Sequence, residues 1–194
     1  MQICFASHND NKVKEMNEII PEGFSIVGLN ELGIQEDIAE TGDTLEENSK
    51  IKASYVYSRH KMPVFADDSG LLVDSLNGEP GVVSARYAGP ERDDHKNMDL
   101  LLQKLGDNAD RSAEFQTVIS FIDERGELKQ FKGSISGTIL KEKRGSGGFG
   151  YDPIFQPNGY EQTFAELPSD VKNRISHRAK AVQSFLEYLH QKNG

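Results

Sequence analysis

Hydrophobic residues recur at two spacings along the chain, and each spacing predicts one kind of element. Val13 and Met16 share one face at helical spacing, which predicts a helix over residues 12–20. Short continuous apolar runs between turn residues predict buried strands. On this basis we expect strands at residues 2–6, 24–28, 63–66 and 71–75, and helices at residues 12–20, 45–59, 93–105 and over about the last 25 residues.

Helix starts are marked by capping residues. Thr44, followed three positions later by Glu47, fits the capping-box pattern and opens the second predicted helix. Near the end of the chain, Lys172 and His177 would point about 140° apart on one straight helix. We therefore expect a break between them, with Asn173 or Ser176 as a possible N-cap. The break is expected to place residues 176–178 at the entrance of the last helix.

Two long β-prone runs follow the third predicted helix. Residues 113–123 and 127–140 are joined by the turn sequence Asp-Glu-Arg-Gly, which is typical of a hairpin between antiparallel strands. Helices combined with such a hairpin indicate an α/β (α+β) fold with a mixed sheet. The 194 residues contain no repeat and no linker, so we expect a single domain over residues 1–194.

Composition limits the partners of the chain. Hydrophobic residues make up 36%, which is typical of a globular protein once the 18 glycines are included. The net charge of −9 disfavours a nucleic-acid coat or a basic membrane-surface module. Cys4 is the single cysteine, which excludes an intrachain disulfide, and its apolar neighbours indicate a buried side chain. Without a long apolar run or a basic leader, we expect a cytoplasmic protein.

Two polar segments precede predicted helices. Residues 7–12 (Ser-His-Asn-Asp-Asn-Lys) link a strand to a helix N-terminus, where backbone N–H groups and Lys12 suit a polyphosphate. The same residue types are also ordinary turn and cap residues. Residues 36–43 carry Glu40 among several carboxylates, which either stabilise the next helix dipole or bind a hard cation such as Mg²⁺.

Two further segments follow predicted strands. Asp67 and Asp68 repel each other, and a divalent cation would offset this repulsion. In an extended chain they point to opposite faces, so one of them faces a site. Residues 145–150 contain G-x-G-x-x-G, but the following Asp-Pro argues against a Rossmann helix and no kinase motif accompanies it. We expect a flexible turn that lets backbone approach a ligand, with Phe149 and Tyr151 available to stack on a base.

Six short motifs occur in a fixed order. They are Ser7 to Lys12, E-T-G-x-T-x-x-E-N at residues 40–48, A-D-D-S-G-L at 66–71, P-G-x-x-S-A-R-Y at 80–87, G-G-F-G-Y-D-P-x-F at 147–155 and S-H-R at 176–178. Together they resemble the inosine triphosphate pyrophosphatase family, which removes non-standard purine nucleotides. Ser7 stands where threonine is common in that family, and His8 stands where a small residue is frequent.

The resemblance implies a homodimer with an elongated mixed sheet and a cleft between two lobes. It implies hydrolysis of ITP, dITP or XTP to the monophosphate and pyrophosphate, with a Mg²⁺-bound water attacking the α-phosphorus and Asp68 as general base. By the same resemblance, Glu40 and Asp68 bind the metal. Phosphate is bound by Ser7, His8, Asn9, Asp10, Asn11, Lys12 and Lys172, substrate is contacted by Ser69, and the base is bound by Phe149, Gly150, Tyr151, Asp152, His177 and Arg178.

Purely structural roles and other functions stay open at this point. A lone histidine such as His177 is more often structural than functional. A pyrophosphatase directed at pyrimidine nucleotides would carry similar chemistry on a similar fold. A nucleotide-binding sensor without turnover is a third interpretation, but a pure binder of polyanions gains nothing from the extra carboxylates at Asp67 and Asp68. A structural or interaction domain would leave all of the polar segments unexplained.

Overall fold

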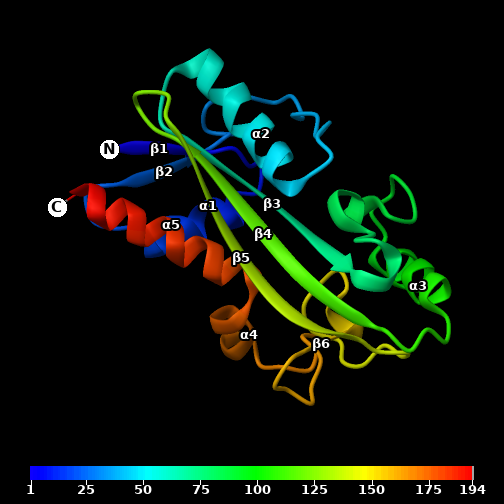
Figure 1. The fold of residues 1–194 in the computed structure, drawn as a ribbon. Helices are drawn as coiled ribbons and strands as arrows, with labels where there is room; N and C mark the ends of the chain where they lie inside the picture. The colour runs from blue at the N-terminus through cyan, green and yellow to red at the C-terminus, as the bar shows by residue number, and fades with distance from the viewer. Residues whose placement is uncertain (194) are drawn as a thin grey trace. The chain divides into compact units, whose positions relative to one another are not determined.

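The computed structural model describes residues 1–193, and Figure 1 shows its elements in chain order. The strands are β1 (Gln2–Phe5), β2 (Ser25–Gly28), β3 (Val64–Val73), β4 (Ser112–Ile122), β5 (Leu128–Ile139) and β6 (Phe155–Pro157). The α-helices are α1 (Asp10–Ile19), α2 (Leu45–His60), α3 (Asp94–Leu105), α4 (Ser169–Ile175) and α5 (His177–Asn193). Short 3₁₀ turns occupy Asp74–Leu76, Gly81–Arg86 and Asp152–Ile154. Within the described chain, no helix combines the length and the apolar character that crossing a membrane requires.

The six strands form one mixed sheet in the order β2-β1-β3-β4-β5-β6. β1 is parallel to both β2 and β3, with Phe5 beside Gly28 on one side and beside Phe65 on the other. β5 and β6 are antiparallel. A short turn in which the Asp123 N–H donates to the Glu127 carbonyl (3.1 Å) joins the neighbouring strands β4 and β5. The predicted hairpin and the predicted mixed sheet are therefore confirmed.

The chain folds as two compact units that are each assembled from separate segments. Unit 1 comprises residues 1–68, 118–132 and 181–194, and unit 2 comprises residues 69–117 and 133–180. The chain passes from one unit to the other within β3, β4, β5 and α5.

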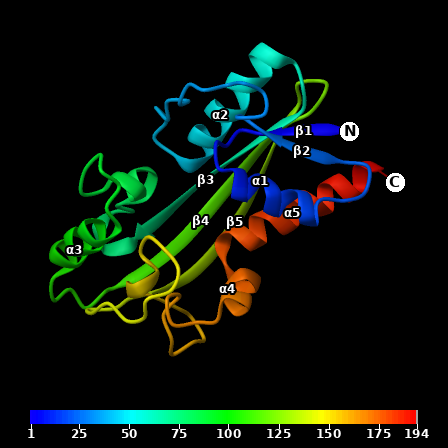
Figure 2. The same cartoon turned by 180° about the vertical axis from the view of Figure 1, so that it is seen from behind.

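Alternation along the strands of unit 1 gives the sheet two apolar faces. Ile3 and Phe5 of β1 and Phe65 of β3 pack on one face against α1 and α5. Cys4 and Ala6, with their even-numbered neighbours on β3, pack on the other face against α2. Because successive side chains of a strand point in opposite directions, one strand can serve both cores. Figures 1 and 2 show α2 on one side of these strands and α1 and α5 on the opposite side.

Unit 2 has one core, which is rich in aromatic residues. Phe115 on β4 packs edge-on against Phe155 of β6, with ring centroids 4.6 Å apart, and Phe164 joins the same cluster. The buried face of α3, including Met98 and Leu101, covers this cluster. The strands and loops that pack around this core carry half of the expected site residues.

The predicted break between the strands at residues 63–66 and 71–75 is wrong, because both belong to the single strand β3. Asp67 and Asp68 therefore lie inside a strand rather than in a loop. Buried residues on both sides of the pair keep the backbone extended through it. α1 also begins two residues earlier than expected, because Asn9 caps it.

Candidate active site

The loop between β1 and α1 is organised by its own side chains. Asn9 Oδ1 accepts hydrogen bonds from the backbone N–H groups of Asn11 (3.1 Å) and Lys12 (3.2 Å), and Ser7 Oγ accepts from the Asn9 N–H (3.1 Å). Some of the N–H groups that were expected to bind phosphate are thus already used by the helix cap. This leaves the Lys12 ammonium as the main cationic feature of the loop.

Lys12 points to β3. Its Nζ lies 3.3 Å from Asp67 Oδ2, and the two side chains are 33% and 11% exposed. Asp67 therefore faces the loop at residues 7–12. Since neighbouring residues of a strand alternate, Asp68 points to the other side of β3 from Asp67.

The segment that carries Glu40 is held against the start of α2. Asn48, which is buried, accepts a hydrogen bond at Oδ1 from the Gly42 N–H (2.7 Å), and Glu47 accepts from the Asp43 N–H (2.7 Å). Thr44 Oγ1 accepts from the Glu47 N–H (3.1 Å), so the predicted cap at Thr44 is confirmed, although Glu47 bonds back to the Asp43 N–H and not to that of Thr44. A side chain at Gly42 would collide with Glu47 and Asn48, which explains why glycine suits this turn.

Lys52 was not predicted from the sequence, and it links the two acidic segments of unit 1. Its Nζ donates to Glu40 Oε1 (2.8 Å) and to the backbone carbonyl of Asp67 (2.5 Å). Burial alone would lower the pKa of Lys52, but the carboxylates of Asp67, Asp68 and Glu40 raise it above its ordinary value. Lys52 is therefore charged at neutral pH. One feature of the sequence could have indicated Lys52: it lies one helical turn after Asn48, on the side of α2 that meets the Glu40 segment.

The carboxylates of unit 1 suit a Mg²⁺ site that substrate phosphates and water would complete. Among residues 1–193, no group of three or more His, Cys, Asp or Glu side chains is close enough to form a complete metal cage. Mg²⁺ is usually bound through one or two carboxylates together with substrate phosphates and water. Glu40, whose side chain is 28% exposed, and Asp68 are the carboxylates here that could provide such oxygen ligands.

In unit 2, the glycine-rich turn presents Phe149 to solvent. The Phe149 side chain is 74% exposed, although its backbone N–H is fixed by Asp152 Oδ2 (3.0 Å). Gly148 has a φ of +72°, and a side chain there would overlap the Asp152 carboxylate. Asp94 at the start of α3 accepts from the Gly150 N–H (2.7 Å). The turn is therefore fixed at several points. A 3₁₀ turn (Asp152–Ile154) and β6 come directly after it, and not an α-helix, as expected.

Lys172 connects the last part of α4 to this turn. Its Nζ forms an ion pair with Asp152 Oδ2 and lies 4.5 Å from the centre of the Phe149 ring. Burial raises the pKa of Asp152, while the Lys172 ammonium acts in the opposite direction. Asp152 is 3% exposed, so its main contacts are Lys172 and the turn itself.

The stacking surface expected at Tyr151 is corrected by the structure. Tyr151 is 4% exposed, its ring belongs to the core of unit 2, and its hydroxyl donates to the Ser84 carbonyl (2.7 Å). The expectation was wrong because the turn directs the Phe149 ring to solvent and the Tyr151 ring, two residues later, into the core. Ser69 lies on the part of β3 in unit 2, where its hydroxyl is 2.6 Å from that of Thr117.

The predicted break before the last helix is confirmed. α4 ends at Ile175 and α5 begins at His177, with Ser176 Oγ accepting from the Ala179 N–H (3.1 Å). The break places His177 flat against Phe115, with ring centroids 4.8 Å apart and an interplanar angle of 11°. Arg178 follows directly at the first turn of α5.

His177 is held in its neutral form. Burial in the first place, and the nearby charges of Lys172, Arg178 and Lys180 in the second, lower its pKa to about 4. Its Nδ1 is buried and has no hydrogen-bond partner within residues 1–193. A buried ring nitrogen of this kind is costly unless a ligand satisfies it.

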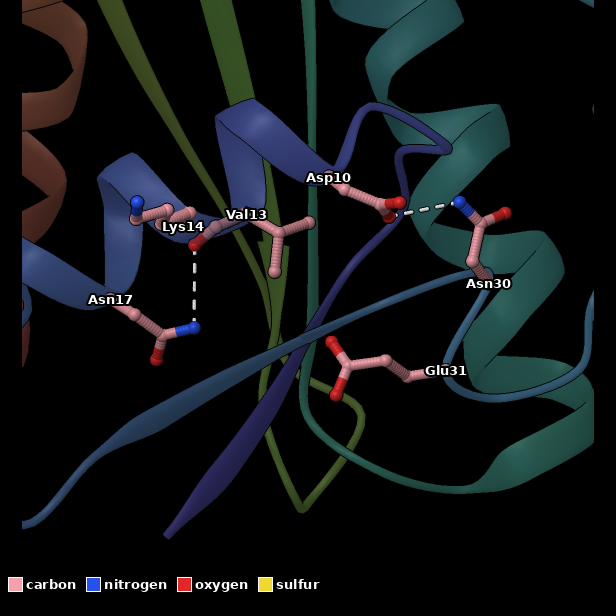
Figure 3. Close-up of a pocket in the computed structure, with 6 residues that line it drawn as sticks. All are labelled: Asp10, Val13, Lys14, Asn17, Asn30 and Glu31. Atoms are coloured by element: carbon pink, nitrogen blue, oxygen red, sulfur yellow. Dashed lines mark hydrogen bonds between the residues drawn. The ribbon is translucent and has the colours of Figure 1, made fainter.

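A surface hollow of about 540 Å³ in unit 1 lies largely outside the expected site. It is lined by Asp10, Val13, Lys14, Asn17, Asn30 and Glu31. Figure 3 shows Asp10 in contact with Asn30 at one end of this hollow, while Asn17 bonds back to the helix. Asp10 is the one lining residue that the sequence motifs had singled out.

The expected residues divide between the two units. Residues 7–12, Glu40 and Asp68 belong to unit 1, where the lysines and carboxylates gather. Ser69, residues 149–152, Lys172, His177 and Arg178 belong to unit 2, where an exposed aromatic ring and cationic side chains gather. The fold defines an α/β protein with one open, mixed sheet flanked by helices.

Comparison with known proteins gives the family. The model of the Ham1 family matches residues 3–188. A protein of Flavobacterium johnsoniae named dITP/XTP pyrophosphatase is 48% identical over 189 residues, covering 97% of this chain and 98% of the relative. A Staphylococcus aureus protein of the same name is 44% identical over 188 residues, covering 97% and 96%. This chain belongs to the Ham1 family.

Solved structures agree with that assignment. The structure of the Staphylococcus aureus Ham1 protein has a TM-score of 0.95 and 42% identity, covering 99% of this chain and 100% of that one. A dITP/XTP pyrophosphatase from Mycobacterium abscessus has a TM-score of 0.86 and 39% identity, covering 96% and 99%. The expected fold class, a mixed sheet flanked by helices as in the inosine triphosphate pyrophosphatases, is confirmed.

Proposed function

We propose that this protein hydrolyses non-standard purine nucleoside triphosphates (ITP, dITP and XTP) to the monophosphate and pyrophosphate, acting as one catalytic domain. The observation that carries the proposal is the gathering of charged side chains in unit 1, where Lys12 pairs with Asp67 and where Lys52 bonds to Glu40 and feels the charge of Asp68, the proposed base. The names of the relatives at 44–48% identity support the same reaction.

The reaction divides between residues that hold the triphosphate and one that moves a proton. Lys12 and Lys172 neutralise phosphate charge, which is the main requirement of phosphoryl transfer. Asp68 accepts a proton from the attacking water, whose oxygen forms a bond to the α-phosphorus. The bond from that phosphorus to the bridging oxygen breaks, and pyrophosphate leaves. Mg²⁺ held by Glu40 and Asp68 would stabilise charge on the phosphate oxygens.

Lys52 acts as a positioning residue in this scheme. It holds the Glu40 carboxylate and the β3 backbone at Asp67 with one ammonium group. Since Asp68 is the next residue on β3, the same contact limits the freedom of the proposed base. Positioning of this kind contributes strongly to catalysis because small displacements of reacting groups reduce the rate.

Selection of the base is assigned to unit 2. The exposed Phe149 ring offers a stacking surface, and base stacking on an aromatic ring is worth ~1–3 kcal/mol. The Arg178 guanidinium is a donor that suits the 6-oxo group of hypoxanthine and xanthine. Adenine presents an amino group there, so a donor at this position would be left unpaired with ATP. His177, being neutral, can present either a donor or an acceptor at Nδ1.

The oligomeric state and the cellular setting belong to the same proposal. We expect a homodimer in the cytoplasm, as the family resemblance and the single buried cysteine Cys4 suggest. Burial raises the pKa of the Cys4 thiol to about 12, which agrees with an inert side chain. Equilibrium sedimentation would give a single species of twice the chain mass if the dimer is correct.

A panel of nucleotides tests the proposed substrate class. With Mg²⁺ present, we expect turnover of ITP, dITP and XTP and little turnover of ATP, dTTP or UTP. Asp68→Asn should remain folded and lose most turnover, while Asp43→Asn, an exposed carboxylate at the start of the same unit's α2, should keep it. Turnover of pyrimidine nucleotides instead would retain the chemistry and reject the base assignment. Binding without any product would favour a nucleotide sensor.

A further inference from the structure

His8 lies in the loop at residues 7–12, and its ring faces Asn30 and Glu36. Its Nδ1 is 2.9 Å from Asn30 Oδ1, and its Nε2 is 3.3 Å from the backbone carbonyl of Glu36. The ring is therefore placed between two other segments of unit 1. The direct phosphate contact expected from the sequence is less suited to this position than a bridging role.

Both atoms that face the His8 ring are hydrogen-bond acceptors. The Asn30 amide group donates from Nδ2 to the His8 carbonyl (3.0 Å) and to Asp10 Oδ1 (2.9 Å). These two bonds fix the orientation of the amide, so it is the Asn30 oxygen that faces His8. The Glu36 carbonyl can only accept. A neutral imidazole has one N–H and can serve one of these acceptors, whereas the imidazolium serves both.

The charges around His8 favour the protonated ring. The hydrogen bond to Asn30 raises the pKa of His8 above its ordinary value, with burial acting weakly against it and the Glu36 carbonyl and the Asp37 and Glu36 carboxylates adding to the rise. Asp10 on α1 reaches the ring through Asn30. Tyr55 and Arg59 on α2 reach it only through Glu36.

Glu36, the second partner of His8, also contacts α2, the helix that carries Lys52. The Glu36 carboxylate accepts a hydrogen bond from the Tyr55 hydroxyl (2.6 Å) on α2. Lys52, which holds Glu40, lies on the same helix less than one turn away. His8 thus connects the loop that carries Lys12 to the segment that leads to Glu40.

We propose that His8 is a positioning residue whose doubly protonated ring ties the loop at residues 7–12 to Asn30 and Glu36, and so holds the cationic and acidic parts of unit 1 in register for the triphosphate. The bridging geometry stands on the contacts alone. Its consequence for the triphosphate rests on the proposed function. The bridge requires a histidine at position 8.

An NMR titration of the histidine rings in the protein without nucleotide tests the bridge by itself. We expect His8 to titrate above the ordinary value of about 6.5, with protons on both nitrogens below its midpoint. Asn30→Ala should lower that midpoint, because it removes the oxygen that faces His8 Nδ1. A His8 midpoint at or below about 6.5, or one that Asn30→Ala leaves unchanged, would overturn the proposal.

Kinetics of His8→Gln then test the positioning role. At low pH the variant should have a KM roughly two- to five-fold above the parent, with kcat nearly unchanged. Glutamine carries both of its N–H donors on one nitrogen, so it does not span the two acceptors that face Nδ1 and Nε2 of His8. The ratio of the two KM values should fall toward one as pH rises through the His8 midpoint. His190→Gln should match the parent at every pH. A ratio that stays constant with pH would mean that His8 is merely structural. An absence of turnover in both proteins would refute the proposed function while leaving the titration result intact.

Discussion

At the scale of single residues, Lys52 carries the connection between the two acidic segments of unit 1. Its side chain is 15% exposed, and its ammonium bonds to Glu40 and to the Asp67 carbonyl. Lys52→Met keeps the length of the side chain and removes the charge. A hydrogen bond to a charged group contributes ~1.5–3 kcal/mol, so we expect kcat/KM to fall about 10- to 100-fold. Steady-state kinetics on ITP measure this loss.

The control for that variant is Lys50→Met on the same helix. Lys50 is exposed, and the same loss of charge there should leave kcat/KM unchanged. Equal effects of the two substitutions would mean that net charge, rather than the contacts of Lys52, sets the activity.

Phe149 shows the opposite arrangement, since its ring is 74% exposed in a turn that is otherwise fixed. Phe149→Ala should leave the melting temperature nearly unchanged and raise KM, because stacking on a base is worth ~1–3 kcal/mol. Ile19→Ala, at another exposed hydrophobic residue, provides the control and should change neither quantity. An unaltered KM in Phe149→Ala would assign the ring to another role.

His177 predicts a specific dependence of stability on pH. Its pKa is about 4 in the folded protein because burial disfavours the charged ring, compared with about 6.5 in the unfolded chain. As pH falls below 6.5, the unfolded chain binds a proton that the folded protein does not, so stability declines until pH reaches about 4. The total loss is about 3 kcal/mol, measured by urea unfolding. His177→Phe should remove this part of the decline, and His190→Gln should retain it.

At the scale of elements, the break between α4 and α5 delivers His177 and Arg178 to unit 2. Ser176 caps α5 through its hydroxyl. Ser176→Ala should lower the free energy of unfolding by about 1 kcal/mol, as loss of an N-cap does. Asn173→Ala, at the other cap considered from the sequence, lies exposed inside α4 and should cost little. A larger loss at Asn173 would contradict the observed position of the break.

The elements also show what the sequence could predict. The helix break and the cap at Thr44 were predictable because both depend on local spacing and on capping side chains. The continuity of β3 was not, because Asp67 and Asp68 are poor strand formers when considered locally. Their extended conformation comes from burial on either side of them, which is a tertiary effect.

The same reasoning applies to the site. Lys12, Glu40 and Asp68 could be selected as candidates because they are charged residues in polar segments that border apolar runs. Lys52 was missed because a lysine on a helix is usually solvated, and only the fold shows that it faces Glu40. Tyr151 was misassigned as a stacking surface because the sequence could not show which aromatic ring of the turn points inward.

At the scale of the whole molecule, we assign the metal-binding and general-base carboxylates to unit 1 and base selection to unit 2, and each unit supplies one lysine for phosphate. The net charge of −9 restricts anion binding to places where lysines gather, such as those around Lys12 in unit 1 and Lys172 in unit 2. In the proposed reaction, six motifs spread over residues 7–178 contribute to one turnover, which agrees with a family match over residues 3–188.

Hydrolysis of ITP in ¹⁸O-labelled water tests most directly whether water attacks the α-phosphorus. Products separated by ³¹P NMR should be the monophosphate and pyrophosphate, with the label in the monophosphate and none in pyrophosphate. Label in pyrophosphate would place the attack on the β-phosphorus. Orthophosphate and a diphosphate would place it on the γ-phosphorus, and either result would contradict attack of water on the α-phosphorus.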